Sequence, residues 1–169
     1  MMKMNKPSDE WQTPQWLYDE LNSEFNFRVD LCATAYNTKI HTYYKNYLTN
    51  EIGFLNVYLT KYTPIQPLSS LVLTYGEPVA VFMNPPYSNP LPFVQKAWED
   101  SKFCKIVMLL PVRTSTKWWK VFWDYEVRKG KQGTEVRFLP KRVAFVRDGK
   151  EVKGTSFDSC IIIMDRRNT

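Results

Sequence analysis

VAVFMNPPYSNP, residues 79–90, is the most informative stretch of this sequence. Its five apolar residues, 79–83, are typical of a strand buried on both faces, as the strands of parallel sheets are. The strand stops at Asn84, because the prolines that follow lock the backbone and offer no N–H to a neighbouring strand. In open α/β sheets the residues after the carboxyl end of a strand border the ligand site. The sequence therefore predicts a functional turn at 84–87.

The chain on the carboxyl side of this turn predicts further helices and strands. Residues 104–111, CKIVMLLP, are nearly all apolar and indicate a central parallel strand. Apolar residues recur at helical spacing in 114–126, which predicts a helix there. Before residue 104 we expect a helix whose buried side carries Phe93, Val94, Ala97, Trp98 and Phe103. Strands are expected at 134–140, 142–147 and 156–164, with Asp148-Gly149 as a two-residue hairpin turn.

The chain before the turn starts with a helix and a strand. Thr13 is the expected N-cap, with Pro14 at the first helical position and a buried stripe of Leu17, Leu21 and Phe25. A short strand is expected at 28–33. Residues 40–78 mix aromatic and polar residues around Pro64 and Pro67, and there we expect loops and short helices.

Early alternation of strands and helices, followed by antiparallel strands, predicts an α/β protein. We expect a three-layer, Rossmann-like sheet that is mostly parallel and has an antiparallel C-terminal edge. The 169 residues fit one domain, 1–169.

The composition disfavours several classes of protein. The opening MMKMNKPSDE is too polar for a signal peptide, and no apolar run reaches about 18 residues, so we expect a cytoplasmic protein without a membrane partner. Three cysteines without Cys-x-x-Cys spacing and one histidine, His41, disfavour a disulfide scaffold, a metal site and a catalytic triad. Glycine-rich phosphate loops are missing from the sequence.

The net charge of +6 is concentrated in one segment. Residues 128–153 hold nine basic and three acidic side chains, so the rest of the chain is neutral. Clustered Lys and Arg favour a polyanion partner, because binding releases its counterions. The alternative is a solvated hairpin whose lysines protect a sheet edge from aggregation.

The turn Asn84-Pro85-Pro86-Tyr87 presents hydrogen-bond acceptors beside an aromatic ring. Prolines leave only carbonyl oxygens exposed, and Asn84 adds a side-chain carbonyl. A planar exocyclic NH₂ fits this arrangement: Asn84 and the Pro85 carbonyl accept its two hydrogens while Tyr87 stacks on the ring. Drawing the hydrogens into these acceptors frees the nitrogen lone pair for in-line attack. We therefore predict that Asn84, Pro85, Pro86 and Tyr87 are catalytic. A proline-stiffened structural turn is the alternative.

With these residues the chain resembles the phage-type DNA N6-adenine methyltransferase (Dam) family. The resemblance rests on NPPY at 84–87, DEWQTP at 9–14, DLCA at 30–33 and LLPVRTSTKWW at 109–119. It implies a Rossmann-like methyltransferase sheet, S-adenosylmethionine as the cofactor, and methyl transfer to an adenine in double-stranded DNA, and it leaves open whether the enzyme is part of a restriction-modification system. It also implies cofactor contacts from Trp11, Thr13, Pro14, Asp30, Leu31 and Cys32. The sequence departs from most methyltransferases at LCATAYN, 31–37, where a glycine-rich loop is usual.

Transfer to an adenine in duplex DNA requires the base to leave the stack. We expect Phe145 to supply a second stacking face opposite Tyr87, with Arg113, Lys141 and Arg142 on the phosphates. The alternative is that Phe145 is an ordinary strand residue whose side chain faces inward. We expect a monomer, or at most a weak dimer, without a separate target-recognition domain, so that short loops such as 61–76 select the DNA sequence. Methylation of RNA or of a protein glutamine, or nucleic-acid binding without catalysis, are the alternative functions.

Overall fold

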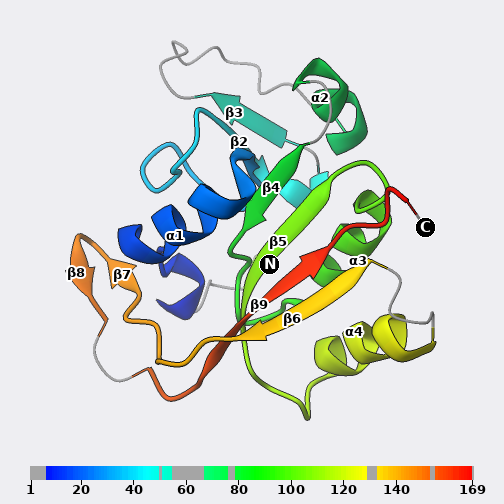
Figure 1. The fold of residues 1–169 in the computed structure, drawn as a ribbon. Coiled ribbons are helices and arrows are strands. Elements are labelled where there is room, and N and C mark those ends of the chain that lie inside the picture. The colour runs from blue at the N-terminus through cyan, green and yellow to red at the C-terminus, as the bar shows by residue number, and fades with distance from the viewer. Residues whose placement is uncertain are drawn as a thin grey trace, which may run out of the picture.

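The computed structural model describes residues 7–49, 51–54, 67–75, 79–128, 133–152 and 155–168. Within these residues, one seven-stranded sheet has the order β3-β2-β1-β4-β5-β9-β6 (Figure 1). Its strands are β1 (Phe27–Asp30), β2 (Thr42–Asn46), β3 (Glu51–Phe54), β4 (Ala80–Met83), β5 (Lys105–Pro111), β6 (Thr134–Phe138) and β9 (Ser159–Met164).

The four strands at the centre of the sheet, β2, β1, β4 and β5, run parallel. At the C-terminal edge, β9 pairs antiparallel with β5 and with β6. These pairings confirm the predicted α/β sheet with a parallel centre and an antiparallel C-terminal edge. At the other edge, β3 pairs antiparallel with β2, which the sequence did not predict.

Helices cover both faces of the sheet, which gives three layers. Glu24, in α1 (Gln15–Phe25), pairs with Arg137 of β6. The next β6 residue, Phe138, lies beside Trp119 of α4 (Lys117–Arg128). Successive strand residues point to opposite faces, so α1 and α4 lie on opposite sides. Helix α3 (Leu91–Asp100) lies alongside α4.

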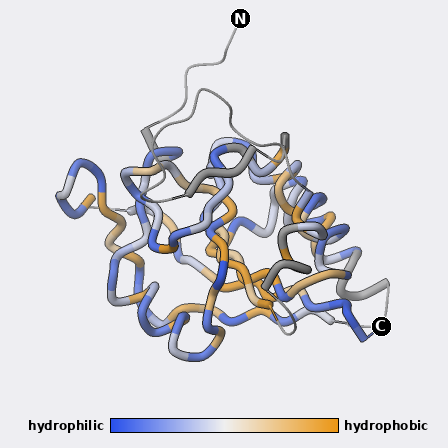
Figure 2. The backbone as a smooth tube through the Cα atoms, turned by 90° about the horizontal axis from the view of Figure 1, so that it is seen from above, coloured by the Kyte–Doolittle hydropathy of each residue, from blue (hydrophilic) through white to orange (hydrophobic). Residues whose placement is uncertain are grey.

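The core lies between these layers. Residues 106–110 of β5 are completely buried, as are Val94 and Ala97 of α3. Figure 2 shows the hydrophobic chain segments gathered at the centre of the molecule, with hydrophilic segments around them. The remaining helices are short: η1 (Pro7–Glu10), η2 (Tyr47–Thr49) and α2 (Leu68–Tyr75). None of the described helices combines the length and apolarity that crossing a bilayer requires.

Two details of the predicted helices are wrong. Helix α1 begins at Gln15, so Pro14 is its N-cap rather than Thr13, and no side chain caps it. Leu17 and Leu21 are buried as expected. Phe103 is 44% exposed instead of lying on the buried side of α3, because that helix ends at Asp100.

The expectation of loops and short helices for 40–78 is only partly right. Strands β2 and β3 lie there, and the predicted sequence-selecting loop 61–76 contains α2 at Leu68–Tyr75. Tyr43 and Tyr44 of β2 are buried, so these β-forming aromatic residues outweigh the polar residues that flank them. Residues 55–66, including Pro64, and 76–78 lie outside the described residues.

The predicted strand 142–147 is reduced to β7 (Val146–Arg147), which pairs with β8 (Lys150–Glu151) outside the main sheet. Val146 also exchanges backbone hydrogen bonds with Gln12, which draws this segment onto the N-terminal chain. The predicted two-residue turn is confirmed: Asp148 and Gly149 have φ of 52° and 74°. Positive φ at both positions is what this hairpin turn requires.

Candidate active site

The parallel strands β1 and β4 are neighbours at the point where the strand order reverses. The chain leaves β1 toward β2 on one side, and later continues from β4 to β5 on the other. Ligands of open α/β sheets bind in the crevice outside the carboxyl ends of strands at such a switch point. Asp30 ends β1 and Asn84 follows β4. The backbone N–H of Leu31 donates to the Phe82 carbonyl, which joins the two strand ends.

Two adjoining cavities lie at this switch point. The larger one is about 330 Å³. The smaller one lies toward β1 and is lined by Trp11, Thr13 and Asp30. Asp9, Cys32, Asn37 and Asn84 line both cavities. The structure therefore brings two residues of the predicted catalytic turn, Asn84 and Pro86, together with four of the six predicted cofactor residues.

The other two predicted cofactor residues, Pro14 and Leu31, do not line these cavities. Both side chains are buried, and Leu31 is 0% exposed. Leu31 follows β1 in the core, and Pro14 is the N-cap of α1.

The side chain of Asn84 is held by the N-terminal segment. Its amide nitrogen Nδ2 donates to the carbonyl of Trp11 at 3.0 Å. Because the nitrogen is engaged in this bond, the oxygen Oδ1 is the end of the amide that can accept hydrogen bonds from a ligand. This orientation agrees with the acceptor role that the sequence predicts for Asn84.

A second contact ties the same two segments together. The carboxylate of Asp9 accepts hydrogen bonds from the Ser88 backbone N–H at 2.9 Å and from the Ser88 hydroxyl at 2.7 Å. The turn 84–87 is thus held at both ends, by Trp11 at its first residue and by Asp9 just after its last. Sequence reasoning missed this role of Asp9. Only its place in DEWQTP, beside Trp11, was a signal, because nothing local relates it to a serine 79 positions later.

Tyr87 lies inside the protein. Its hydroxyl donates to the Leu109 carbonyl of β5 at 3.3 Å, and its side chain is 6% exposed. Burial raises the pKa of Tyr87 well above its usual value. The ring meets Phe145 and Phe157 edge to face, at 5.6 and 5.8 Å between centroids. In this arrangement Tyr87 anchors the turn to β5.

Phe145 is completely buried. Besides contacting Tyr87, its ring stacks on Trp11 at 5.4 Å, and Trp11 stacks on Phe157 at 5.8 Å. The structure thus favours the packing alternative for Phe145 over the expected role as a stacking face for a base. Phe157, which the sequence left without a role, completes this aromatic cluster. The cluster supports Trp11, whose carbonyl in turn holds Asn84.

Asp30 is a buried carboxyl group that lines the smaller of the two cavities. Its Oδ1 accepts a hydrogen bond from the Cys32 backbone N–H at 3.3 Å. Burial raises the pKa of Asp30 from 3.8 to about 7, although the backbone N–H groups of Cys32 and Lys39 and the charge of Lys39 lower it. An ionised carboxylate in such a place is stabilised by a cationic ligand. Asp30 is therefore suited to bind an ammonium group.

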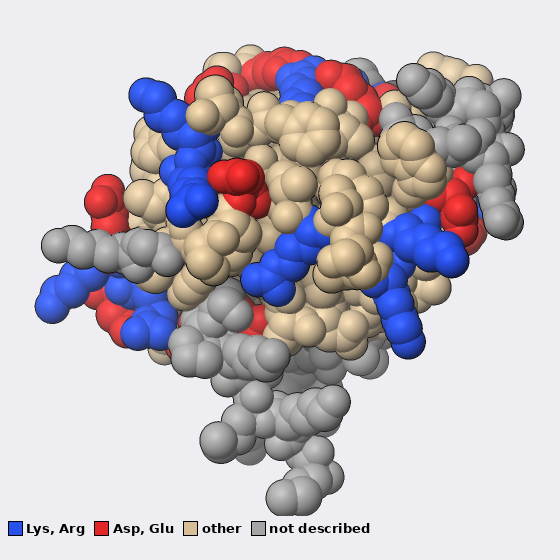
Figure 3. Space-filling model, turned by 90° about the horizontal axis from the view of Figure 1, so that it is seen from below, with Lys and Arg blue, Asp and Glu red and all other residues tan. Residues whose placement is uncertain are grey.

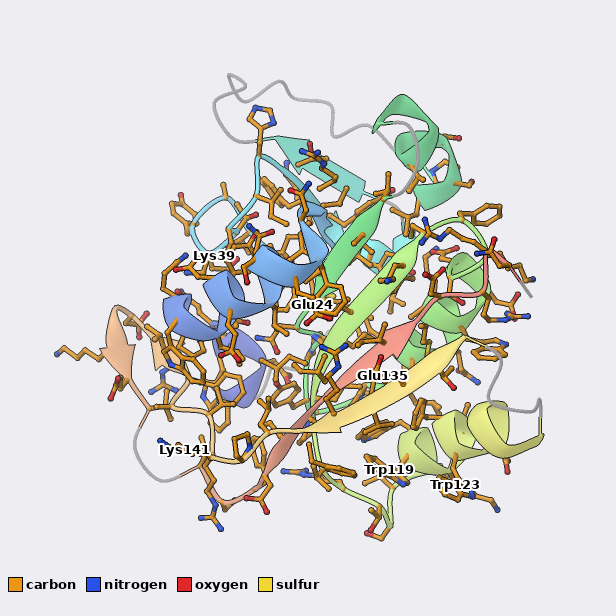
Figure 4. All side chains as sticks on the ribbon, viewed as in Figure 1. Glu24, Lys39, Trp119, Trp123, Glu135 and Lys141 are labelled. Atoms are coloured by element: carbon orange, nitrogen blue, oxygen red, sulfur yellow. The ribbon has the colours of Figure 1, made fainter. Side chains whose placement is uncertain are left out.

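Three predicted DNA contacts lie in neighbouring loops beyond β5. The Arg113 guanidinium lies 5.1 Å from the centroid of Phe157. Arg142 contacts Asp158 at 3.4 Å, and the Val112 N–H donates to the Asp158 carbonyl. Lys141 is exposed. Figure 3 shows Lys and Arg side chains spread across the lower face, and Figure 4 labels Lys141 at its edge.

The basic segment 128–153 is not one continuous surface. Arg137 turns to the α1 side of the sheet, where its guanidinium pairs with both oxygens of Glu24 and with Glu135. These carboxylates raise the pKa of Arg137. Figure 4 shows Glu24 and Glu135 close together in front of the sheet. Lys129, Lys131 and Lys153 lie outside the described residues.

Comparison with known proteins gives consistent matches. A family model described as DNA N-6-adenine-methyltransferase (Dam) matches residues 2–169. A DNA N-6-adenine-methyltransferase of Haemophilus phage HP1 is 33% identical over 175 residues, which cover 98% of this chain and 85% of the phage protein. A DNA N-6-adenine-methyltransferase of Escherichia phage T1 is 27% identical over 169 residues, covering 92% of this chain and 62% of that protein.

Proposed function

Because the chain belongs to the DNA N-6-adenine-methyltransferase (Dam) family, we propose that it transfers a methyl group from S-adenosylmethionine to the N6 amine of a flipped adenine in double-stranded DNA. The observation that carries the proposal is the fixed Asn84 amide. It borders two cavities at the switch point of the sheet, and Trp11 holds its nitrogen so that its oxygen can accept from a ligand.

The residues around the cavities suit the cofactor. The larger cavity, about 330 Å³, lies within the range of small-molecule sites, roughly 300–1,000 Å³. In the smaller cavity that adjoins it, Asp30 offers a carboxylate to the amino group of the cofactor, beside Trp11 and Thr13, and Cys32 lines both cavities. Pro14 and Leu31 support these residues from the core. S-adenosylmethionine supplies a methyl group on a positively charged sulfur, which makes that methyl electrophilic.

The catalytic turn acts on the amine. The Asn84 Oδ1 and the Pro85 carbonyl accept the two N6 hydrogens, which directs the nitrogen lone pair away from the adenine ring. Positive charge develops on N6 during attack, and these fixed acceptors stabilise it more than they stabilise the neutral amine. Pro86 stiffens the turn, and the Tyr87 bond to Leu109 fixes its far end. Water takes the proton that the methylated amine loses.

The chain's own bonds explain why no strong base is required. The acceptors are held before the substrate arrives, by Trp11 at Asn84 and by Asp9 at Ser88. They need no reorganisation as the charge develops, which is where much of an enzyme's electrostatic catalysis arises.

Incubation with S-adenosylmethionine labelled in its methyl group tests the function. Separate reactions receive duplex DNA, RNA and a glutamine-rich protein, and digestion followed by mass spectrometry identifies the methylated atom. We expect N6-methyladenine in the DNA reaction. Label confined to RNA or to protein would contradict the proposal, and so would binding of DNA without binding of the cofactor in calorimetry.

A further inference from the structure

A second surface hollow lies at the start of α4, apart from the cavities at the switch point. It encloses about 480 Å³ and is lined by the turn 114–116, by Lys117 and Lys120, and by Trp119 and Trp123. Its described lining contains no aspartate or glutamate. In the sequence, Trp119 served only for the family resemblance, and Trp123 had no role beyond its place in the predicted helix 114–126.

We call this hollow the α4 groove. Of its two tryptophans, Trp119 packs against buried rings and Trp123 is exposed to solvent. The ring of Trp119 meets Trp118 edge to face at 5.4 Å and Phe122 at 6.0 Å, and both of these neighbours are buried. Trp123 follows Trp119 by one helical turn, so both lie on one face of α4. Its side chain is 53% exposed. The two indoles therefore line the hollow together, one packed against buried rings and the other exposed.

The polar part of the groove is built by a closed turn. The Thr116 N–H and hydroxyl both donate to the Arg113 carbonyl, at 3.1 and 2.7 Å. Thr114 and Ser115 are exposed. Lys117 and Lys120, one turn apart on α4, are exposed as well. Hydroxyl groups and ammonium groups beside aromatic rings form the surface that binds a nucleic-acid strand: cations and hydroxyls contact phosphates, and rings pack on bases or sugars.

The groove continues the edge at which the proposed reaction takes place. It begins directly after Arg113, in the loop that leaves the carboxyl end of β5, the parallel neighbour of β4. Figure 4 shows Trp119, Trp123 and Lys141 along the same lower edge of the molecule. Figure 3, seen from below, shows Lys and Arg side chains on both sides of this face.

We infer that the α4 groove, residues 114–123, binds the DNA strand that flanks the target base. Lys117 and Lys120 contact its phosphates, and the indole of Trp123 packs against a base or sugar of that strand. The inference rests on the proposed function for the identity of the ligand. A protein partner fits less well, because the chemistry of the groove is complementary to a polyanion. The groove extends the DNA-binding surface from the loops around Lys141 to the opposite end of the edge.

Comparing the DNA affinities of matched variants tests whether the groove binds DNA. Fluorescence anisotropy with a labelled duplex compares Trp123→Ala with Trp16→Ala, which removes an equally exposed tryptophan (54%) from α1. Because stacking on one ring contributes about 1–3 kcal/mol, Trp123→Ala is expected to weaken binding by about 5- to 150-fold. Trp16→Ala is expected to bind as the wild type does. Equal affinity of the two variants would overturn the inference.

The salt dependence of DNA binding tests whether the lysines of the groove contact phosphates. Loss of one phosphate contact lowers the slope of log affinity against log salt by about one. We expect this from Lys120→Ala and not from Lys102→Ala, whose lysine is half exposed and pairs with Glu99 at the other end of the sheet. Equal slopes for both variants would contradict the assignment.

Two further measurements separate this inference from its alternatives. If Trp123→Ala reduces self-association in sedimentation experiments but leaves DNA affinity intact, the groove is a contact between copies of the chain and the inference is wrong. Wild-type protein that binds DNA without methylating it would overturn the proposed function. The Trp123 and Lys120 affinities would still decide whether the groove binds DNA.

Discussion

At the scale of single residues, the turn 84–87, proposed to be catalytic, owes its geometry to partners far away in the sequence. Trp11 holds Asn84, Asp9 holds Ser88, and Leu109 accepts from Tyr87. The local sequence predicts the chemistry of the turn, because proline and asparagine carry it themselves. It does not predict these partners, because long-range hydrogen bonds have no periodic signal.

The hydroxyl of Tyr87 contributes to stability. Tyr87→Phe removes its hydrogen bond to the Leu109 carbonyl and leaves that buried acceptor with one partner fewer. We expect the free energy of unfolding to fall by about 0.5–1.5 kcal/mol. Denaturant unfolding measures this loss, with Tyr36→Phe as the control because Tyr36 is 97% exposed. Unchanged stability of Tyr87→Phe would show that the hydroxyl has no structural role.

The contact between Asp9 and Ser88 positions the turn. Asp9→Ala removes both hydrogen bonds to Ser88. Since a displacement of about 1 Å at a reacting group can cost about 10²-fold in rate, we expect methyl transfer to slow by roughly tenfold to a hundredfold. Glu10→Ala, which changes the neighbouring charge, is the control and is expected to keep its rate. If Asp9→Asn restores most of the rate, the role is one of position rather than charge; equal rates for Asp9→Ala and Glu10→Ala would exclude it.

Asp30 makes stability and cofactor binding depend on pH in opposite directions. Its folded pKa, about 7, is raised above the unfolded value of 3.8. The folded state therefore holds the proton more tightly, and stability falls as pH rises from about 4 to 7. In the proposed role of Asp30 the ionised form binds the cofactor's ammonium, so affinity should rise over the upper part of this range. Calorimetry of wild type and Asp30→Asn at several pH values measures both trends. An equally steep affinity profile in Asp30→Asn would refute the assignment.

At the scale of elements, apolar runs predicted β4, β5 and β9, and the Asp148-Gly149 signal predicted the hairpin. The same reasoning missed β2 and β3, because TYYKN and EIGF are short and show neither a long apolar run nor a regular alternation of apolar and polar residues. It also extended one strand over 142–145. There Val143 and Phe145 are buried, as in a strand, but Phe145 packs against Trp11 and Tyr87. Burial alone does not distinguish strand from loop.

The division of the basic segment predicts different roles for its arginines. Lys141 and Arg142 lie in the loop near Arg113, whereas Arg137 pairs with Glu24 on the α1 side. Replacing Lys141 and Arg142 together by Ala should flatten the salt dependence of DNA binding by up to about two in slope. Arg137→Ala should leave that slope unchanged and reduce stability by at most about 1 kcal/mol, because its ion pairs are partly exposed. A similar change of slope in both variants would mean that binding follows total charge.

At the scale of the whole molecule, one edge of the sheet gathers the functional parts. The carboxyl ends of β1, β4 and β5 contribute Asp30, the turn 84–87 and the loop with Arg113. The N-terminal segment crosses this edge and bonds to the turn. The order of strands in the sheet thus explains why residues from distant parts of the sequence share one site, and why the fold was easier to predict than the contacts.

In the proposed mechanism Asn84 stabilises the charge that develops on the amine, and a single-turnover assay of Asn84→Ala measures this contribution. The assay uses excess enzyme with a DNA duplex and labelled S-adenosylmethionine, and calorimetry measures cofactor affinity in parallel. Since one fixed acceptor contributes about 10²–10³ in rate, methyl transfer should slow by that factor while cofactor affinity stays close to that of the wild type. Methyl transfer at the wild-type rate in Asn84→Ala would contradict the claim.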